Sequence, residues 1–400
     1  MKNSVTLAAG TLLCREDSAP DVGASGARPR AERSSVLHFW LRLRRVVTLA
    51  VITFLLGCVP MRLLASGSQP NPALAELQAA LDLDRRGEYR DALQKYQAFL
   101  SNASVNLNPQ LHAYVLQQMA DADNGLGDYA KGEEKAREAL RLLGGADARN
   151  TSMFATAERV LADALAGEGN YLEAKKIAQQ AVSLGKETIS SHAPSFGILL
   201  TSLAHILQNR GEHRHALKLY QQALGIMEKA GEGNRIELGG AYANLAGAYL
   251  AKGNAKKALE LVALALATWK QVLPSNNSFT VYALCIEMLG YEKLKAYREA
   301  EGLIPETLEL AVAQLGPSHP DRAMLLHLAA SVYVAEKKYE LAAPLLKQGV
   351  EISKRVFPPG NPVSRILLAN YSNVLAKLGQ TEEASRARAE SEVLLAFPDR

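Results

Sequence analysis

The segment NLAGAYLAKGNAKKA, residues 244–258, contains the pattern that decides the fold of this 400-residue chain. Small and apolar side chains recur at helical spacing on both sides of Gly253, which indicates two antiparallel helices joined by a tight turn. The pattern repeats around eight turn positions, first 40 and then 42 residues apart: Gly87, Gly127, Gly169, Gly211, Gly253, Lys295, Lys337 and Gly379. A fixed period of this length predicts stacked helical hairpins and not one globular core.

Residue size also follows the turns. Small residues such as Ala246 and Ala258 stand seven before and five after most turns, where they would let the paired helices approach closely. Larger residues recur four residues before the turns, as Tyr249 does, and two residues after them, as Tyr171 does. We expect these side chains to fill the space between hairpins. The sequence predicts an all-α fold of about sixteen helices without a sheet.

This arrangement resembles the tetratricopeptide repeat, and the 42-residue period resembles its kinesin light chain type. The linkers Leu315–Asp321 and Phe357–Pro362, with the helix start Leu341–Leu345, are the nearest matches to that type. The resemblance implies an α-solenoid, a right-handed superhelix of about eight units. The array is predicted over residues 71–400, with units at approximately 71–108, 109–150, 151–192, 193–234, 235–276, 277–318, 319–360 and 361–400.

A different kind of sequence precedes the array. Residues 1–45 are predicted to be a disordered leader or charged n-region, 46–58 a signal-peptide apolar region, and 59–70 a linker. The apolar region ends in Leu-Leu-Gly-Cys at 55–58, which resembles the lipobox of bacterial lipoproteins, and this makes Cys58 a candidate lipidation site.

Other interpretations of the leader stay open. The apolar segment could remain as an uncleaved signal anchor, cleavage could follow Gly67 and release a secreted protein, or Cys58 could be inert. Translation beginning near Val36 and an organelle transit peptide are further alternatives. The signal interpretations place the repeats outside the cytoplasm, because the positive residues precede the apolar segment, and we expect a membrane-attached protein of a bacterial envelope.

Charge argues against nucleic acid as a partner. The formal net charge is +4, but residues 1–69 hold nine Lys and Arg against four acidic residues, which leaves 36 basic and 37 acidic residues in 70–400. The basic excess therefore belongs to the leader.

Catalytic motifs are not found in the sequence. It has no Walker-type phosphate loop, no paired-His zinc helix and no Gly-x-Ser-x-Gly elbow, so we expect no enzyme, no cofactor, no metal and no small-molecule substrate. His213 and His215 lie two apart at a turn, a poor geometry for a metal site. We expect Cys285 to be a small buried residue, His319-Pro320 to be a helix start, and most acidic residues to lie on outer faces.

By the family resemblance, residues thirteen, ten, nine, six and three before each turn line a concave groove. The strongest candidates for peptide binding are Asn244, Thr201, Ser202, His205, Gln208, Arg159, Asp163, Gln117, Asn370 and Asn373. Further groove positions are Tyr114, Gln118, Asp121, Asn124, Tyr282, Glu292, His327 and Ser331. Amide side chains suit an extended peptide because each offers a donor and an acceptor. A solvated wall without a ligand is the competing interpretation.

The sequence therefore favours a non-enzymatic scaffold or adaptor that binds a partner protein or extended peptide, attached to the membrane through its N-terminal segment or a lipid. One alternative is a regulatory or sensor subunit that controls a partner protease or kinase. A third is an enzyme with its site inside the array.

Overall fold

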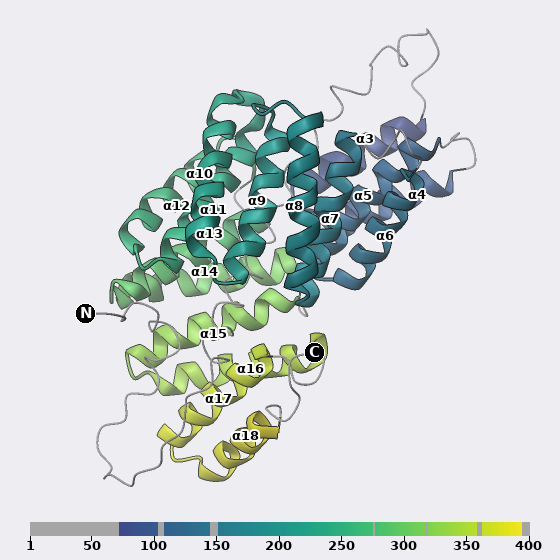
Figure 1. Ribbon diagram of the computed structural model, residues 1–400. Coiled ribbons are helices and arrows are strands. Elements are labelled where there is room, and N and C mark those ends of the chain that lie inside the picture. The colour runs from purple at the N-terminus through teal and green to yellow at the C-terminus, as the bar shows by residue number, and fades with distance from the viewer. Residues whose placement is uncertain are drawn as a thin grey trace. The chain divides into compact units, whose positions relative to one another are not determined.

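The computed structural model describes residues 72–102, 108–144, 151–274, 277–316, 319–357 and 362–393, and these ranges contain sixteen α-helices and no strand. The helices follow one another as hairpins (Figure 1). The pairs are α3 (Pro72–Arg85) with α4 (Tyr89–Ser101), α5 (Pro109–Leu126) with α6 (Tyr129–Leu142), α7 (Ser152–Glu168) with α8 (Tyr171–Thr188), α9 (Pro194–Asn209) with α10 (His213–Lys229), α11 (Arg235–Ala251) with α12 (Ala255–Trp269), α13 (Ser278–Lys293) with α14 (Tyr297–Leu315), α15 (Pro320–Ala335) with α16 (Tyr339–Val356), and α17 (Pro362–Lys377) with α18 (Thr381–Val393). A short 3-10 helix, η3 (Glu232–Asn234), precedes α11. The predicted all-α fold is confirmed.

Every predicted turn position adopts the left-handed backbone conformation. The six glycines have φ between 76° and 95°, and Lys295 and Lys337 each have φ of 61°. At seven of these turns the next residue donates its N–H to the carbonyl five residues earlier, as Asp128 does to Asp123 at 2.9 Å. This is the Schellman arrangement, which ends the first helix and reverses the chain.

Several first helices begin with a proline behind a capping residue. Asn108 accepts the Leu111 N–H through its side chain at 2.7 Å, ahead of Pro109. His319 caps α15 in the same way, because its Nδ1 accepts the Asp321 N–H at 3.1 Å and Pro320 follows it. Proline is tolerated here because the first helical N–H has no partner inside the helix. The expectation that His319-Pro320 starts a helix is confirmed.

Small residues form the seam inside each hairpin. The alanines seven before and five after the turns are fully buried at almost every repeat, and Ala246 and Ala258 are both 0% exposed. Helix α5 packs against its own partner α6, while α6 and α5 both pack against α7. The same scheme joins α15, α16 and α17. Each hairpin thus buries its apolar face against its neighbour, as stacked repeats require.

The tyrosines two after each turn differ from the expectation. Tyr89 and Tyr129 are buried, but Tyr171, Tyr297 and Tyr339 are only half-buried. All five tyrosines are the first residues of their helices, so the position in the helix does not explain the difference.

The last hairpin has a polar second helix. Arg388 on α18 is exposed and pairs with Glu392 at 3.2 Å on the same helix. The apolar or aromatic residues at the matching position of α4 and α10 are Tyr96 and Tyr220, both nearly fully buried. A polar outer face of this kind is typical of the capping repeats of helical arrays.

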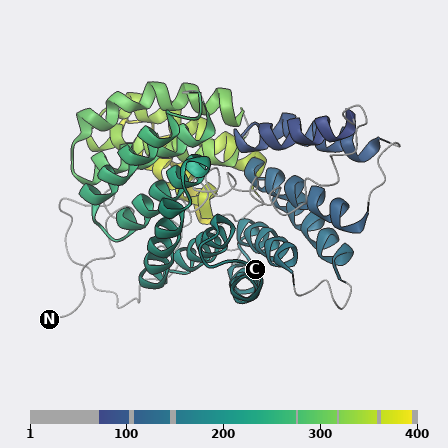
Figure 2. The ribbon, with the colours of Figure 1, turned by 90° about the horizontal axis from the view of Figure 1, so that it is seen from above.

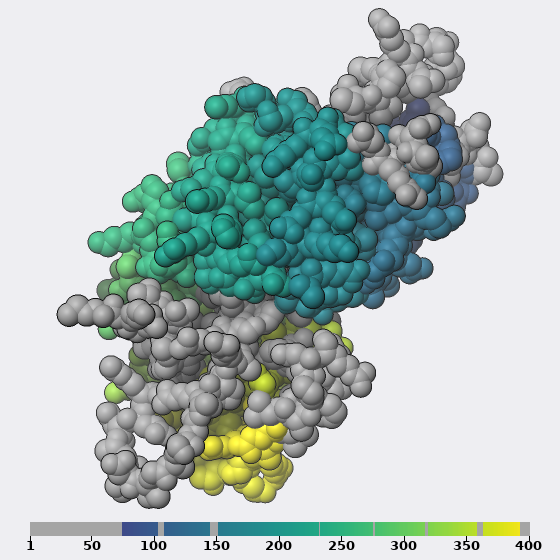
Figure 3. Space-filling view, in the orientation of Figure 1, coloured from purple at the N-terminus to yellow at the C-terminus, as the bar shows by residue number. Residues whose placement is uncertain are grey.

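The chain divides into two compact units. We call the described residues of 72–252 and 257–283 the N-terminal unit, and those of 253–256 and 284–393 the C-terminal unit. In the N-terminal unit the successive hairpins follow a curved path (Figure 2), and their outer side chains form a closely packed surface (Figure 3).

The first turn of the N-terminal unit lies against a helix far along the chain. A Cβ added to Gly87 would come within 2.3 Å of the Ser278 hydroxyl at the start of α13. Glycine is therefore required at position 87 both for its backbone conformation and for this close approach.

Candidate functional site

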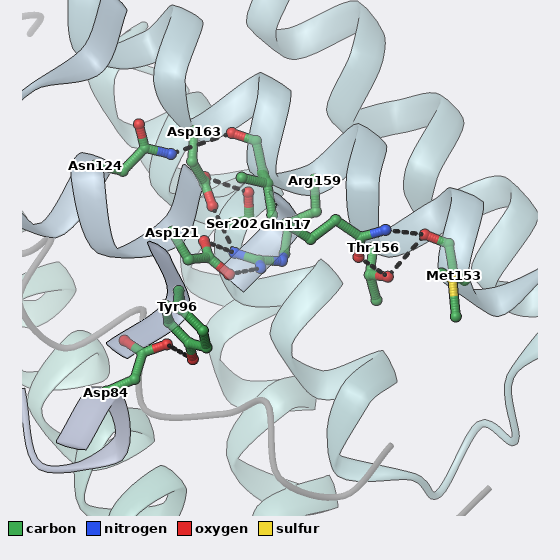
Figure 4. A network of polar contacts seen from close by, with 11 residues as sticks. Asp84, Tyr96, Gln117, Asp121, Asn124, Met153, Thr156, Arg159, Asp163 and Ser202 are labelled. Atoms are coloured by element: carbon green, nitrogen blue, oxygen red, sulfur yellow. Dashed lines mark hydrogen bonds and ion pairs between the residues drawn. The ribbon is translucent and has the colours of Figure 1, made fainter. Parts of the chain in front are cut away.

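A row of polar contacts crosses the first helices α5, α7 and α9 of the N-terminal unit (Figure 4). Arg159 on α7 contacts both carboxylate oxygens of Asp121 on α5, and its Nη1 lies 3.1 Å from Asp121 Oδ1. The same Nη1 donates to Asp163 Oδ2 at 3.0 Å. The Ser202 hydroxyl on α9 donates to Asp163 Oδ1 at 2.5 Å. We call these four residues the first-helix row.

The repeat geometry explains why these side chains meet. Arg159 and Asp163 stand four apart and therefore lie on one face of α7. Asp121 and Asp163 both stand six before their turns, so neighbouring first helices present carboxylates at equivalent heights. Arg159 lies between them and binds both. The row thus links three consecutive hairpins through side chains alone.

A second set of contacts runs beside the row. The Thr156 hydroxyl donates to Gln117 Oε1 at 3.0 Å, and Gln117 Nε2 donates to the Met153 carbonyl at 3.3 Å. Seven residues beyond Gln117 on α5, Asn124 Nδ2 donates to the Val160 carbonyl at 3.3 Å. Each contact joins α5 to α7, so the amides of Gln117 and Asn124 hold neighbouring hairpins in register.

Burial dominates the electrostatics of the row. The Arg159 side chain is 4% exposed and that of Asp121 is 1% exposed. Burial raises the pKa of Asp121 to about 6, while the Arg159 guanidinium opposes that shift. Although burial disfavours the charged guanidinium, Asp121 and Asp163 outweigh it and raise the pKa of Arg159. Near pH 7 the pair is therefore ionised on both sides.

The first hairpin adds a buried carboxylate that the sequence analysis did not single out. Asp84 on α3 is 4% exposed and accepts a hydrogen bond from the Tyr96 hydroxyl at 3.0 Å, as Figure 4 shows. Burial, followed by the nearby Asp121 carboxylate, raises the pKa of Asp84 well above its usual range. Asp84 stands three residues before Gly87, which is one of the predicted groove positions. The repeat spacing, applied to the first repeat, therefore points to Asp84.

Most acidic residues of the described ranges are exposed or partly exposed, as expected. Asp84, Asp121, Asp123 and Glu237 are exceptions, because all four are buried. Asp123 pairs with Lys135 at 2.6 Å. The physical reason is the repeat stack, which covers first-helix positions on both sides and so buries residues that an isolated helix would expose.

The other predicted groove residues of this unit are also mostly buried. Thr201, His205, Gln208 and Asn244 are each less than 10% exposed. The Thr201 hydroxyl donates to the Gly197 carbonyl of its own helix at 2.9 Å, so its proton is already used. The structure does not bring Asn244 into the first-helix row.

In the C-terminal unit the structure brings together two first-helix residues. Asn370 Nδ2 on α17 lies 2.6 Å from His327 Nε2 on α15. Burial lowers the pKa of His327 to about 4, which keeps the imidazole neutral and able to accept this hydrogen bond. Asn373 is exposed, and the Ser331 hydroxyl donates to the Leu328 carbonyl at 2.8 Å.

Reactive groups are few in the part of the chain that the structure describes. Cys285 is fully buried, and burial raises the pKa of its thiol, which leaves it an inert core residue as expected. Among the described residues, no group of three His, Cys, Asp or Glu side chains is arranged to hold a metal ion.

Comparison with known proteins identifies the repeats. The tetratricopeptide repeat model matches residues 152–229, 195–271 and 290–355. The chain is a tetratricopeptide repeat protein. These matches fall on both units and agree with the repeat frame set by the turns at positive φ. No curated protein matches the chain significantly in sequence.

Several solved structures are similar to this chain. A Rap protein complexed with Competence and Sporulation Factor is 14% identical, with a TM-score of 0.56 over 81% of this chain and 98% of that one. NprR in complex with its cognate peptide NprX is 14% identical, with a TM-score of 0.53 over 82% of this chain and 100% of that one. A putative kinesin light chain from Podosopora anserina is 25% identical, with a TM-score of 0.40 over 50% of this chain and 94% of that one.

The predicted leader, apolar region, linker and Cys58 lie outside the described residues. Within the described ranges, no helix combines the length and apolar character needed to cross a membrane.

Proposed function

We propose that this tetratricopeptide repeat protein is a scaffold that binds an extended peptide segment of a partner protein along the first helices of its N-terminal unit. The observation that carries the proposal is the concentration of polar side chains there. Amides, hydroxyls and carboxylates stand three, six, nine or ten residues before the turns on α3, α5, α7, α9 and α11. An extended peptide has donors and acceptors at a regular spacing, which a repeating row of such groups can match.

Not every polar group of this surface is used within the protein. Asp84 Oδ1, Tyr114 Oη and Gln118 Oε1 are buried and have no hydrogen-bond partner among the described residues. A buried polar atom without a partner costs about 1 to 3 kcal/mol, so a ligand that supplies the missing bonds gains that energy on binding. Folds of this kind accommodate such ligands, since NprR was solved with its cognate peptide.

Peptide selection with the full chain tests this function. Random decapeptides displayed on their messenger RNA would be enriched on the immobilised protein, and the best peptide would then carry a benzophenone photo-crosslinker. The proposal expects micromolar or tighter binding and crosslinks on α3, α5, α7, α9 or α11. Crosslinks confined to second helices such as α6, α8 and α10, or no enrichment over a bead control, would contradict it.

Attachment to a bacterial envelope is a separate part of the proposal, and it rests on the sequence alone. Cys58 follows the apolar region directly, in the position that lipoprotein processing requires. If Cys58 carries lipid, cells that express the chain will incorporate a labelled fatty acid into it, and Cys58→Ala will abolish the label. Cys14→Ala is the matched control. Label that persists in Cys58→Ala would rule out lipidation at this residue.

A further inference from the structure

A cluster of buried polar side chains lies where the first hairpin meets the second. Asp84 comes from the last turn of α3, and Tyr114, Gln118 and Asp121 come from α5, where they stand at i, i+4 and i+7 and so share one helix face. Asp84 accepts a hydrogen bond from the Tyr96 hydroxyl, and Tyr96 packs with Tyr114 in one buried core cluster, which places Asp84 beside α5.

Among the described residues, Asp84 has no basic partner in an ion pair. Arg159 is shared between Asp121 and Asp163 at 3.1 Å and 3.0 Å. The only described hydrogen bond of the Asp84 side chain comes from the Tyr96 hydroxyl to Oδ2, which leaves Oδ1 buried and unpartnered. Burying a carboxylate without a cation is costly, and burial accordingly raises the pKa of Asp84 and favours its protonated form. A positive group from elsewhere would offset that cost and favour the ionised form.

The neighbouring unpartnered atoms have the same chemical character. Gln118 Oε1 accepts hydrogen bonds, and the Tyr114 hydroxyl can accept one as well as donate. Both side chains are more than nine-tenths buried. A carboxylate, an amide oxygen and a phenol together form a cluster of acceptors, which suits a group that donates several hydrogen bonds and carries a positive charge.

We propose that this cluster, Asp84, Tyr114 and Gln118 beside Asp121, binds a basic group of the partner peptide, a Lys or Arg side chain or a free N-terminal amine. The inference rests on the proposed peptide-binding function and defines the chemistry of its ligand. The ammonium or guanidinium donates to Asp84 Oδ1 and Gln118 Oε1, and it supplies the counter-charge that Asp84 lacks.

The test uses the decapeptide selection on the full chain, repeated with Asp84→Asn. Asparagine keeps an oxygen for the Tyr96 hydroxyl but removes the charge. Asp82→Asn is the matched control, because Asp82 lies on the same helix and is exposed. With the native chain and with Asp82→Asn, Lys or Arg should be enriched at one position of the selected peptides. With Asp84→Asn that enrichment should disappear.

Affinities then separate a binding role from a structural one. Replacing the selected Lys or Arg by Met should weaken binding to the native chain by about 10- to 150-fold, as expected for a charge-assisted hydrogen bond, and should not weaken binding to Asp84→Asn. Acetylating the peptide N-terminus distinguishes the two sources of the cation. The melting temperature of Asp84→Asn should not fall, because the substitution removes a buried carboxyl group that has no cation beside it.

The outcomes distinguish the two proposals. Selected peptides without any basic preference, or a basic preference that persists in Asp84→Asn, would overturn the proposed cation site and leave peptide binding intact. A selection that enriches no peptide would overturn both.

Discussion

Arg159 on α7 holds Asp121 on α5 in a two-pronged ion pair that is almost completely buried, although the two residues are 38 positions apart in sequence. That separation is four residues short of the 42-residue repeat, so the pair joins one hairpin to the next across one helical turn. Asp163 and Ser202 extend the connection by one further repeat. Polar side chains therefore help to set the register of a stack whose other contacts are small and apolar.

Replacing Arg159 by Met tests the weight of this connection. The variant leaves the buried Asp121 and the partly buried Asp163 without their cation, and removing one partner from a buried ion pair costs about 3 to 5 kcal/mol. We expect the free energy of unfolding, measured by urea denaturation with circular dichroism, to fall by about that amount.

Arg137→Met is the control for loss of an arginine on a neighbouring helix. Arg137 pairs with Glu133 at 2.7 Å, but its side chain is 52% exposed, and exposed pairs contribute about 0 to 1 kcal/mol. Equal losses for Arg137→Met and Arg159→Met would show that the buried row adds no special stability.

The two lysines in left-handed turns are strained, and replacing them by glycine should stabilise the fold. Lys337 has φ of 61° and is exposed, so Lys337→Gly relieves about 1 to 2 kcal/mol of steric cost without removing packing. The greater freedom of glycine in the unfolded chain offsets part of this, which leaves a gain of about 1 kcal/mol.

Thermal melts of Lys337→Gly and Lys295→Gly should both shift upward. Lys347→Gly is the control, because Lys347 is exposed inside α16, where glycine costs about 1 kcal/mol. A downward shift for both turn variants would mean that the lysine side chains make stabilising contacts that outweigh the strain.

The buried Glu237 on α11 should make stability depend on pH. Burial raises its pKa to about 7 from the usual 4.5, so the folded protein holds this proton more tightly than the unfolded chain does. Its contribution favours folding at low pH and is lost as pH rises from about 4.5 through 7. Glu237→Gln removes the titration.

The measurement is urea unfolding of the native chain and Glu237→Gln at pH 5 and pH 8. The free energy of unfolding of Glu237→Gln minus that of the native chain should be larger at pH 8 than at pH 5. Glu260 lies at an exposed position of α12, so Glu260→Gln should differ from the native chain by the same free energy of unfolding at both pH values. If Glu237→Gln also shows no change between the two pH values, the carboxyl is not buried in solution.

Much of the fold could be predicted because the repeat frame does not depend on any single residue. Spacing alone placed the turns at Lys295 and Lys337, where the residue type argues against a left-handed conformation, and the structure has φ of 61° at both. The alanines of the hairpin seam follow from the same frame, since a position repeated in many units is constrained by the packing of all of them.

The polar network could not be predicted in the same way. Gln117, Arg159 and Asp163 were expected to face a ligand, but the structure shows all three bonded to neighbouring helices. The repeat spacing predicts where along its helix a side chain lies. Whether that side chain contacts a ligand or the next helix depends on how closely the hairpins stack. Opposite charges on neighbouring first helices, such as Asp121 and Arg159, were the one available signal.

The central claim is that a partner peptide binds along the first helices, and Asn244 on α11 is the predicted contact that tests it most directly. Asn244→Ala removes a donor and an acceptor while leaving the seam residues Ala246 and Ala258 unchanged. Lys257→Ala, an exposed change on the second helix α12, is the matched control.

The decisive measurement is the dissociation constant of the selected decapeptide, by fluorescence anisotropy, for the native chain and both variants. We predict that Asn244→Ala weakens binding by about 5- to 150-fold, which corresponds to about 1 to 3 kcal/mol for hydrogen bonds lost from a desolvated backbone. Lys257→Ala should bind like the native chain. Equal affinities for Asn244→Ala and Lys257→Ala would contradict binding along the first helices.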